Sequence, residues 1–185
     1  MPTYKFKRKD TSTIQEIEHM INLTKYPWVK ALIVFLFLYG CRITEALNLQ
    51  TSDVWIENEY IVAKIGVLKR RNQKSGPYEN LPHLVHININ APLAKLHLLP
   101  YLISTKNTQA RLFPVSRQLA WIRIKEVNQQ ISPHVFRHDR LMKLAIKGAS
   151  EAELMDWAGW TDSRPASSYI RATGRLAMNL ADKVE

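Results

Sequence analysis

The sequence lacks the features that mark secreted and membrane proteins. It contains a single cysteine, Cys41, which excludes an internal disulfide and a cysteine metal cluster. Its most apolar run, residues 29–40, is too short to cross a bilayer and suits a buried helix. The basic start of the chain has no apolar segment of the secretory type. We therefore expect a protein of the cell interior with no membrane partner.

Acidic residues are scarce relative to basic ones. Sixteen Asp and Glu stand against 26 Lys and Arg, which gives a formal net charge of +10. Such an excess favours an anionic partner, most often nucleic acid, because basic side chains bind phosphates and release counterions. A basic protein without such a partner explains the charge equally well. Charge alone leaves both interpretations open.

Neither internal repeats nor a long Gly-, Ser- or Pro-rich linker divides the 185 residues. A chain of this length with 46% hydrophobic residues is expected to form one domain with its own core. Helical spacing of apolar residues dominates, and strands are expected at 53–55, 59–68 and 83–89. These patterns predict an α+β fold that is mostly helical, with a small three-stranded antiparallel sheet at one edge.

Several helix ends are predicted from capping residues. Gly40 suits the left-handed end of the apolar helix, and Thr44 is expected to cap the short helix that follows. Ser132 and Pro133 predict the start of another helix, with Ser132 capping the free amides. Pro100 is expected to end or kink the helix of residues 91–104.

Three basic side chains share one face of the helix that begins at Pro133. His134, Arg137 and His138 stand at positions i, i+3 and i+4. This histidine spacing is also used by zinc sites, but no glutamate follows His134 and Arg137 would repel a dication. The stripe therefore favours an anion over a metal.

The other candidate residues have ordinary explanations when each is considered alone. Arg42 follows a helix-ending glycine and Lys69 ends a strand, and most such residues in a basic protein are surface charges. A tyrosine such as Tyr169 is more often a half-buried side chain than a nucleophile. Their order along the chain changes this interpretation.

Together these residues resemble the catalytic domain of the tyrosine recombinase (phage integrase) family. The chain contains GCRITEAL, IGVLK, HVFRH and AGW in this order, followed by a tyrosine nine residues after Trp160. The family has an arginine, a lysine on a sheet hairpin, His-x-x-Arg-His, a histidine or tryptophan, and a nucleophilic tyrosine. The resemblance extends from the first helix to about Ala172 and concerns the catalytic domain only.

The resemblance implies a role for each matching residue. The implied catalytic residues are Arg42, Lys69, His134, Arg137, Trp160 and Tyr169. Glu45 and His138 are implied to support them. Lys74 is the alternative to Lys69, because the loop is rich in lysine and its register is open. The residues of this loop that we expect to contact DNA are Lys69, Arg70, Arg71 and Lys74.

The implied function is that of a site-specific recombinase, which cleaves and rejoins duplex DNA through a 3′-phosphotyrosine without metal, ATP or another cofactor. The family resemblance implies a tetramer on two paired DNA sites, and we expect a monomer or weak dimer in free solution. It implies a location in the cytoplasm at the nucleoid, or inside the host cell of a virus or plasmid. A type IB topoisomerase and a DNA-binding module that no longer cuts are the alternatives.

The resemblance also predicts how the chain is divided. Residues 1–10 are expected to be a basic N-terminal segment, 11–173 the catalytic domain and 174–185 a C-terminal helical tail. The N-terminal core-binding domain that family members usually carry is expected to be absent, which would weaken DNA affinity. The tail is expected to pack on its own domain, with exchange between neighbouring protomers as the alternative.

Overall fold

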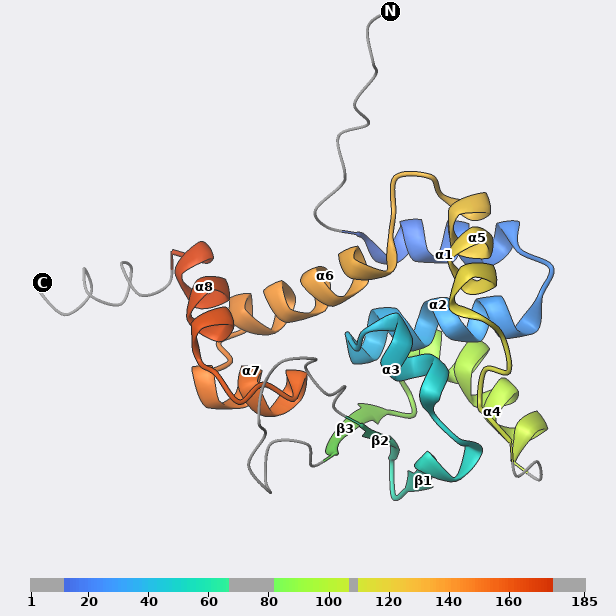
Figure 1. Cartoon of the computed structure of the whole chain (residues 1–185), viewed down its shortest axis with the longest axis horizontal. Helices are drawn as coiled ribbons and strands as arrows, with labels where there is room; N and C mark the ends of the chain where they lie inside the picture. The colour runs from blue at the N-terminus through green and yellow to red at the C-terminus, as the bar shows by residue number, and fades with distance from the viewer. Residues whose placement is uncertain (1–11, 67–81, 107–109, 175–185) are drawn as a thin grey trace, which may run out of the picture.

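A computed structural model of the chain describes residues 12–66, 82–106 and 110–174. Helices surround the apolar helix α2 (Pro27–Tyr39), and a three-stranded sheet lies at one edge of them (Figure 1). The mostly helical α+β class with a small antiparallel sheet is confirmed. Within the described ranges, no helix combines the length and the apolar character that crossing a membrane requires.

Helix α2 forms the centre of the larger core, because every residue from Ala31 to Tyr39 is buried. A helix that is apolar on all sides must be covered on all sides. It packs against α1 (Ile14–Leu23), α5 (Arg117–Val127) and α6 (Pro133–Ile146). We call this set of packed residues the α2 core.

The predicted end of α2 is confirmed at Gly40. This residue has a φ of 65°, in the left-handed region that glycine adopts without steric cost. A Cβ at this position would lie 2.9 Å from both Cβ and Cγ of Arg140 on α6. Gly40 therefore also lets α6 approach the end of α2 closely.

The predicted cap of the next helix is wrong. Helix α3 (Ile43–Asn48) begins after Arg42, two positions before the expected cap at Thr44. The reason is that the Glu45 carboxylate accepts a hydrogen bond from the backbone N–H of Arg42 at 2.6 Å. A carboxylate from the first turn thus closes the start of the helix, as in a capping box.

The start of α6 is confirmed at Pro133, although the predicted serine cap is not. Ser132 occupies the N-cap position, but its side chain makes no capping hydrogen bond. Of the two outcomes expected at Pro100, the helix does not end there, but it changes from one helix type to another directly before this residue. A short π-helical segment (Ala94–Leu98) leads into α4 (Leu99–Thr105), and Pro100 lies in the first turn of α4. A missing N–H is tolerated at that position.

The sheet consists of β1 (Val54–Glu57), β2 (Tyr60–Ile65) and β3 (His83–Asn88), paired antiparallel in this order. A short 3₁₀ turn (Thr51–Asp53) precedes β1. Ile65 pairs with His83 at the end of the β2–β3 ladder, next to the 67–81 connection that lies outside the described residues. The buried face of the sheet belongs to the α2 core.

A second, smaller cluster joins the far end of α6 to α7 (Glu151–Ala158) and α8 (Arg164–Ala172). The buried residues of this cluster are Leu141, Ala145, Leu154, Ala158, Ala166 and Ile170. Figure 1 shows α7 and α8 at one end of the molecule, where both pack on α6 and α7 also packs on β3. We call it the α7–α8 cluster.

Candidate active site

One buried carboxylate holds two arginines that are 95 positions apart in the sequence (Arg42 and Arg137). Arg42 Nη1 donates to Glu45 Oε1 at 2.6 Å, and Arg137 Nη1 lies 3.8 Å from Glu45 Oε2. The Glu45 side chain is 1% exposed and that of Arg42 is 36% exposed. The two cations are therefore neighbours, with Arg42 facing the solvent side of the pair.

Backbone carbonyl groups from two elements fix Arg137. Its Nη1 donates to the carbonyl oxygen of Gly40 at 3.0 Å, and its Nη2 donates to that of Ala158 at 3.0 Å. Burial lowers the pKa of the Arg137 guanidinium, and the neighbouring Arg42 lowers it further, while Glu45 opposes both effects. An arginine starts from a pKa so high that it remains a cation at any working pH.

An aromatic pair continues from Arg137 to the predicted nucleophile. The Cζ of Arg137 lies 5.4 Å from the ring centroid of Trp160, a cation–π contact. The Trp160 ring in turn stacks on the ring of Tyr169, with centroids 5.9 Å apart. The His138 ring lies 5.4 Å from that of Tyr169. Trp160 thus lies between the buried guanidinium and the phenol.

The Tyr169 phenol is half-buried on α8. Burial raises its pKa above the ordinary value, and the positive charge of Arg137 acts in the opposite direction. Arg137 is therefore close enough to act on the phenol electrostatically. Withdrawal from water keeps the phenol protonated, whereas a nearby cation favours the phenolate.

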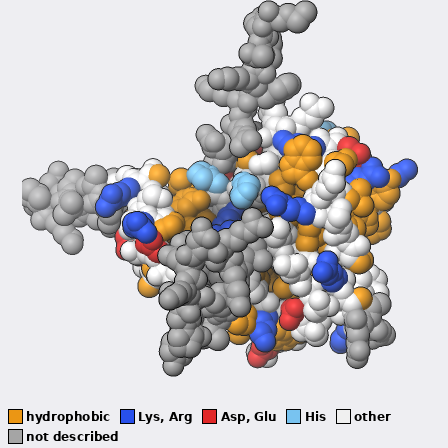
Figure 2. Space-filling view, viewed as in Figure 1, with side chains coloured by type: hydrophobic (Ala, Val, Ile, Leu, Met, Phe, Trp, Pro, Cys, Tyr) orange, Lys and Arg blue, Asp and Glu red, His pale blue; other side chains and the backbone are white. Residues whose placement is uncertain are grey.

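The three basic side chains predicted to share one face of α6 differ in their exposure. His134 is exposed, His138 is half-buried, and Arg137 turns inward to the carbonyl groups described above. Histidine atoms lie side by side on the face shown in Figure 2, next to hydrophobic and basic side chains. Within the described ranges, no three His, Cys, Asp or Glu side chains are grouped so that they could hold a metal ion.

The sequence profile of the phage integrase family matches residues 10–175. The chain belongs to the phage integrase family. No curated protein matches this integrase-family chain by sequence. The match covers nearly the whole chain, including both arginines and the tyrosine, so it supports the predicted association with DNA recombination and integration.

Solved recombinase structures share the fold of this integrase-family chain. The XerA recombinase has a TM-score of 0.65 at 17% identity, and the match covers 92% of this chain and 61% of that one. The XerH recombinase bound to its difH substrate before cleavage has a TM-score of 0.60 at 15% identity. That match covers 88% of this chain and 50% of XerH.

The Tn1549 transposon integrase in complex with transposon right-end DNA is also similar, with a TM-score of 0.61 at 16% identity. The match covers 98% of this chain and 68% of that integrase. Our chain therefore spans between half and about two thirds of the length of the recombinase chains in these structures. The likeness confirms the predicted recombinase catalytic-domain fold.

Four predicted residues of this integrase domain cannot be placed. Lys69, Arg70, Arg71 and Lys74 lie outside the described residues. The choice between Lys69 and Lys74 therefore stays a prediction from the sequence.

The structure adds a residue that the sequence did not suggest. His83, the first residue of β3, lies close enough to Glu45 and Arg137 for both charges to act on its imidazole. Its position at the start of an alternating strand carries no signal that it faces a site. Gly40 and Ala158 also belong to the site, but only through their backbone carbonyl groups.

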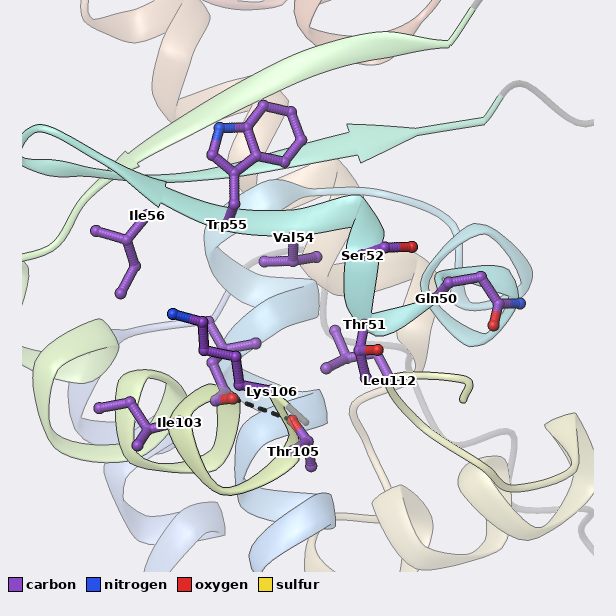
Figure 3. Close-up of a pocket in the computed structure, with 11 residues that line it drawn as sticks. Gln50, Thr51, Ser52, Val54, Trp55, Ile56, Ile103, Thr105, Lys106 and Leu112 are labelled. Carbon is purple, nitrogen blue, oxygen red and sulfur yellow. Dashed lines mark hydrogen bonds between the residues drawn. The ribbon is translucent and has the colours of Figure 1, made fainter. Parts of the chain in front are cut away.

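The large hollow shown in Figure 3 lies elsewhere in the integrase domain. It has a volume of about 790 Å³ and lies between the β1 edge and α4, with Trp55, Ile56, Ile103 and Lys106 among its lining residues. Neither of the two arginines nor Tyr169 lines it. We therefore centre the candidate active site on the group Arg42, Glu45, Arg137, Trp160 and Tyr169.

Proposed function

We propose that this integrase-family chain is the catalytic part of a site-specific recombinase that cleaves and rejoins duplex DNA through a 3′-phosphotyrosine. The proposal rests on one observation above all. Glu45 holds Arg42 and Arg137 together, and Trp160 connects Arg137 to the Tyr169 ring. This arrangement supports the proposal, because attack by tyrosine on a phosphodiester requires positive charge near the phenol, and Arg137 acts electrostatically on the Tyr169 phenol.

The two arginines form the proposed phosphate clamp. A guanidinium has five N–H groups, and among the described residues Arg137 donates two of them to carbonyl oxygens, so we propose that others bind phosphate oxygens. Arg42 is the more exposed partner and approaches the phosphate from the solvent side. Each preorganised donor of this kind contributes about 2.7–4 kcal/mol to the stability of the transition state.

In the proposed cleavage step, the phenol oxygen of Tyr169 attacks the phosphorus and the P–O5′ bond breaks. The products are a 3′-phosphotyrosine and a free 5′-hydroxyl, and reversal of the step rejoins a strand. The phosphotyrosine bond keeps the energy of the phosphodiester bond, because no water hydrolyses it, so the step consumes no ATP. The two arginines supply the positive charge that a metal ion would otherwise supply.

Two proton transfers complete the step. Lys69, with Lys74 as the alternative, donates a proton to the departing O5′, because a lysine among arginines has a lowered pKa and is a competent acid. His134 accepts the phenol proton or donates to a phosphate oxygen. His138 and Trp160 orient the Tyr169 ring, which both contact.

Duplex DNA is the proposed partner. The chain has an excess of basic residues, and the similar XerH and Tn1549 proteins were solved with DNA. We propose four protomers on two paired sites, a monomer or weak dimer without DNA, and a location at the nucleoid or inside a host cell. DNA affinity should fall steeply with salt, because several phosphates must be neutralised.

A nicked DNA library tests the reaction without knowledge of the target site. The chain is mixed with nicked duplexes of randomised sequence and denatured, and the DNA linked to protein is isolated and sequenced. We expect an adduct at a 3′ end, enriched in one sequence. Tyr169→Phe should bind the DNA and form no adduct, whereas Tyr60→Phe, at an exposed tyrosine of β2, should react normally.

The same assay separates the alternatives. An undiminished adduct with Tyr169→Phe would remove this residue from the role of nucleophile. Adducts spread over all sequences, together with relaxation of supercoiled plasmid and no recombinant product, would indicate a topoisomerase. Binding with no adduct by the unmodified chain would indicate a module that no longer cuts.

A further inference from the structure

Trp157 links the ends of two helices through its indole N–H. It lies on α7, one position before the last residue of that helix, and its Nε1 donates to the carbonyl oxygen of Tyr39 at 2.9 Å. Tyr39 is the last residue of α2. The last carbonyls of a helix have no partner within it, so they need a donor from elsewhere. The end of α2 finds this donor on α7.

Arg137 closes a loop with this hydrogen bond. The carbonyl that follows that of Tyr39 belongs to Gly40 and accepts from Arg137 Nη1 at 3.0 Å. The carbonyl that follows that of Trp157 belongs to Ala158 and accepts from Arg137 Nη2 at 3.0 Å. Two consecutive residues therefore take part at each helix end, and the guanidinium spans the gap between the ends. The separation of the two carbonyls decides where this guanidinium lies.

The ring of Trp157 contacts both hydrophobic regions of the domain. It packs against the α2 core and also against the α7–α8 cluster. The Cζ of Arg140, on α6, lies 4.7 Å from the ring centroid, a cation–π contact. Neighbours from several helices therefore hold the ring, and this fixes the direction of its N–H.

We propose that Trp157 is a positioning residue, which keeps the two carbonyls that hold Arg137 at the right separation and so aims this guanidinium at the phosphate. The proposal rests on the function proposed above. A donor stabilises the transition state best when it already points to the place where charge develops. An error of about 1 Å in such a position can cost about 10²-fold in rate. Trp157 acts through Arg137 and needs no contact with DNA.

Two changes remove the indole N–H of Trp157. Trp157→Phe loses the donor and some volume but keeps an aromatic ring beside Arg140. A tryptophan analogue with sulfur in place of the indole N–H, incorporated at position 157 only, loses the donor and keeps the shape. On a nicked duplex of the enriched sequence, both should form the tyrosine adduct about tenfold more slowly, the effect of one hydrogen bond. DNA affinity should stay within about twofold of normal.

A tryptophan on β1 provides the matched control. Trp55 Nε1 donates to Glu57 Oε2 at 3.2 Å, outside the candidate active site. Trp55→Phe, and the sulfur analogue at position 55, should therefore change neither rate nor affinity. Urea unfolding of each variant shows whether a slow rate reflects loss of the fold. A folded chain with the analogue at position 157 that reacts as fast as the unmodified chain overturns the proposal.

An uncharged substrate separates the positioning of Arg137 from a general loosening of the site. A methylphosphonate at the cleaved position has a methyl group in place of one non-bridging oxygen, so it carries one negative charge less and gains less from a guanidinium. The analogue at position 157 should slow adduct formation with this substrate by less than about twofold. A slowing of about tenfold on both substrates would mean that Trp157 supports the fold or Tyr169 instead, which overturns the proposal.

Nuclear magnetic resonance of the Arg137 side chain tests the link without cleavage. Hydrogen bonds to two carbonyls hold the guanidinium and should slow rotation about its Cζ–Nη bonds. The sulfur analogue at position 157 should speed this rotation, whereas the analogue at position 55 should not. Unchanged rotation overturns the proposal. If the unmodified chain forms no adduct but the rotation responds to the analogue, the proposed function fails and the link from Trp157 to Arg137 stands.

Discussion

The α2 core and the α7–α8 cluster differ in size, in composition and in what they hold. The α2 core contains large side chains in close contact, such as Phe35 and Tyr39, whose stacked rings have centroids 4.2 Å apart. Among the described residues, the α7–α8 cluster has six that are buried, and three of them are alanines. The Glu45 carboxylate, which joins the two arginines, lies beside the α2 core. Tyr169, the predicted nucleophile, packs against the α7–α8 cluster.

Because of this difference, we expect the two halves of the candidate site to resist displacement unequally. Dense packing of large side chains resists displacement, because every shift loses many contacts. The α7–α8 cluster has fewer buried residues and half of them are alanines, so less buried apolar area holds α8 in place. The arginine pair is therefore built into the fold, whereas the tyrosine helix is attached to it lightly.

Arg137 joins the two regions, and its removal should have the largest effect on stability. It binds the carbonyl of Gly40 beside the α2 core and that of Ala158 in the α7–α8 cluster. Arg137→Ala leaves the buried Glu45 charge without this partner and two carbonyls unpaired. We expect a loss of about 3–5 kcal/mol in the free energy of unfolding, measured in urea.

A matched arginine in the same region gives the control for this substitution. Arg171 is exposed on α8, so Arg171→Ala should change the free energy of unfolding by less than about 0.5 kcal/mol. Similar losses in both variants would mean that Arg137 does not join the two regions.

Equal truncations in the two regions should have unequal costs. Ile33 is fully buried in α2, and Ile33→Ala should cost about 4 kcal/mol because the surrounding core cannot close the cavity. Ile170 is 4% exposed in α8, and Ile170→Ala should cost about 2 kcal/mol, since α8 can shift to fill the space.

Amide hydrogen exchange shows which helices unfold locally in each of these two variants. Ile170→Ala should speed exchange at the amides of α8 while those of α2 keep their protection. Ile33→Ala should lower protection throughout the described helices. Equal costs with the same exchange pattern would remove the distinction between the two regions.

Alkaline pH should weaken the α2 core. Burial raises the pKa of the Tyr39 phenol and of the Cys41 thiol far above their ordinary values of 10.0 and 9.0. Since the folded chain holds these protons more tightly, the stability they contribute is complete below the ordinary pKa values and is lost as pH rises above them. Unfolding in urea should show a loss of about 1 kcal/mol per pH unit for each group.

Cys41→Ala separates the two contributions. This variant should lose less stability than the unmodified chain from about pH 9 upward, because the thiol no longer contributes. An unchanged dependence on pH would show that the thiol is not the group responsible.

The smallest effect is expected at the contact between α7 and α8. The Ser167 hydroxyl donates to Glu151 Oε1 at 2.5 Å and joins the two helices, whereas the Ser168 hydroxyl donates to Pro165 within α8. Ser167→Ala should cost about 0.5–1 kcal/mol and speed hydrogen exchange in α8. Ser168→Ala should leave that exchange unchanged, and the reverse order would contradict a role for Ser167 in attaching the helix.

Sequence patterns predicted the elements well because their signals are local. The apolar run of α2, its glycine end and the alternation in β2 and β3 each depend on neighbouring residues. The start of α3 was misplaced because the Glu45 side chain closes it by accepting a hydrogen bond from the backbone N–H of Arg42. The N-cap residue is therefore an arginine, a residue type that does not predict a helix start.

Side-chain directions in the site could not be predicted in the same way. Periodicity placed His134, Arg137 and His138 on one face, but Arg137 turns inward because carbonyls of Gly40 and Ala158 are available to it. Those partners lie 97 and 21 positions away in the sequence. The position of His83 likewise depends on which helix covers the end of β3, and strand alternation contains no such information.

Gly40 has a consequence for how such a site can change. Arg137 binds the carbonyl of a residue that has no side chain, at the point where α6 comes close to the end of α2. A single methyl group there would meet Arg140, force α6 outward and carry Arg137 with it. An alanine at this turn would therefore disturb the geometry of the proposed site while leaving every one of its side chains in place.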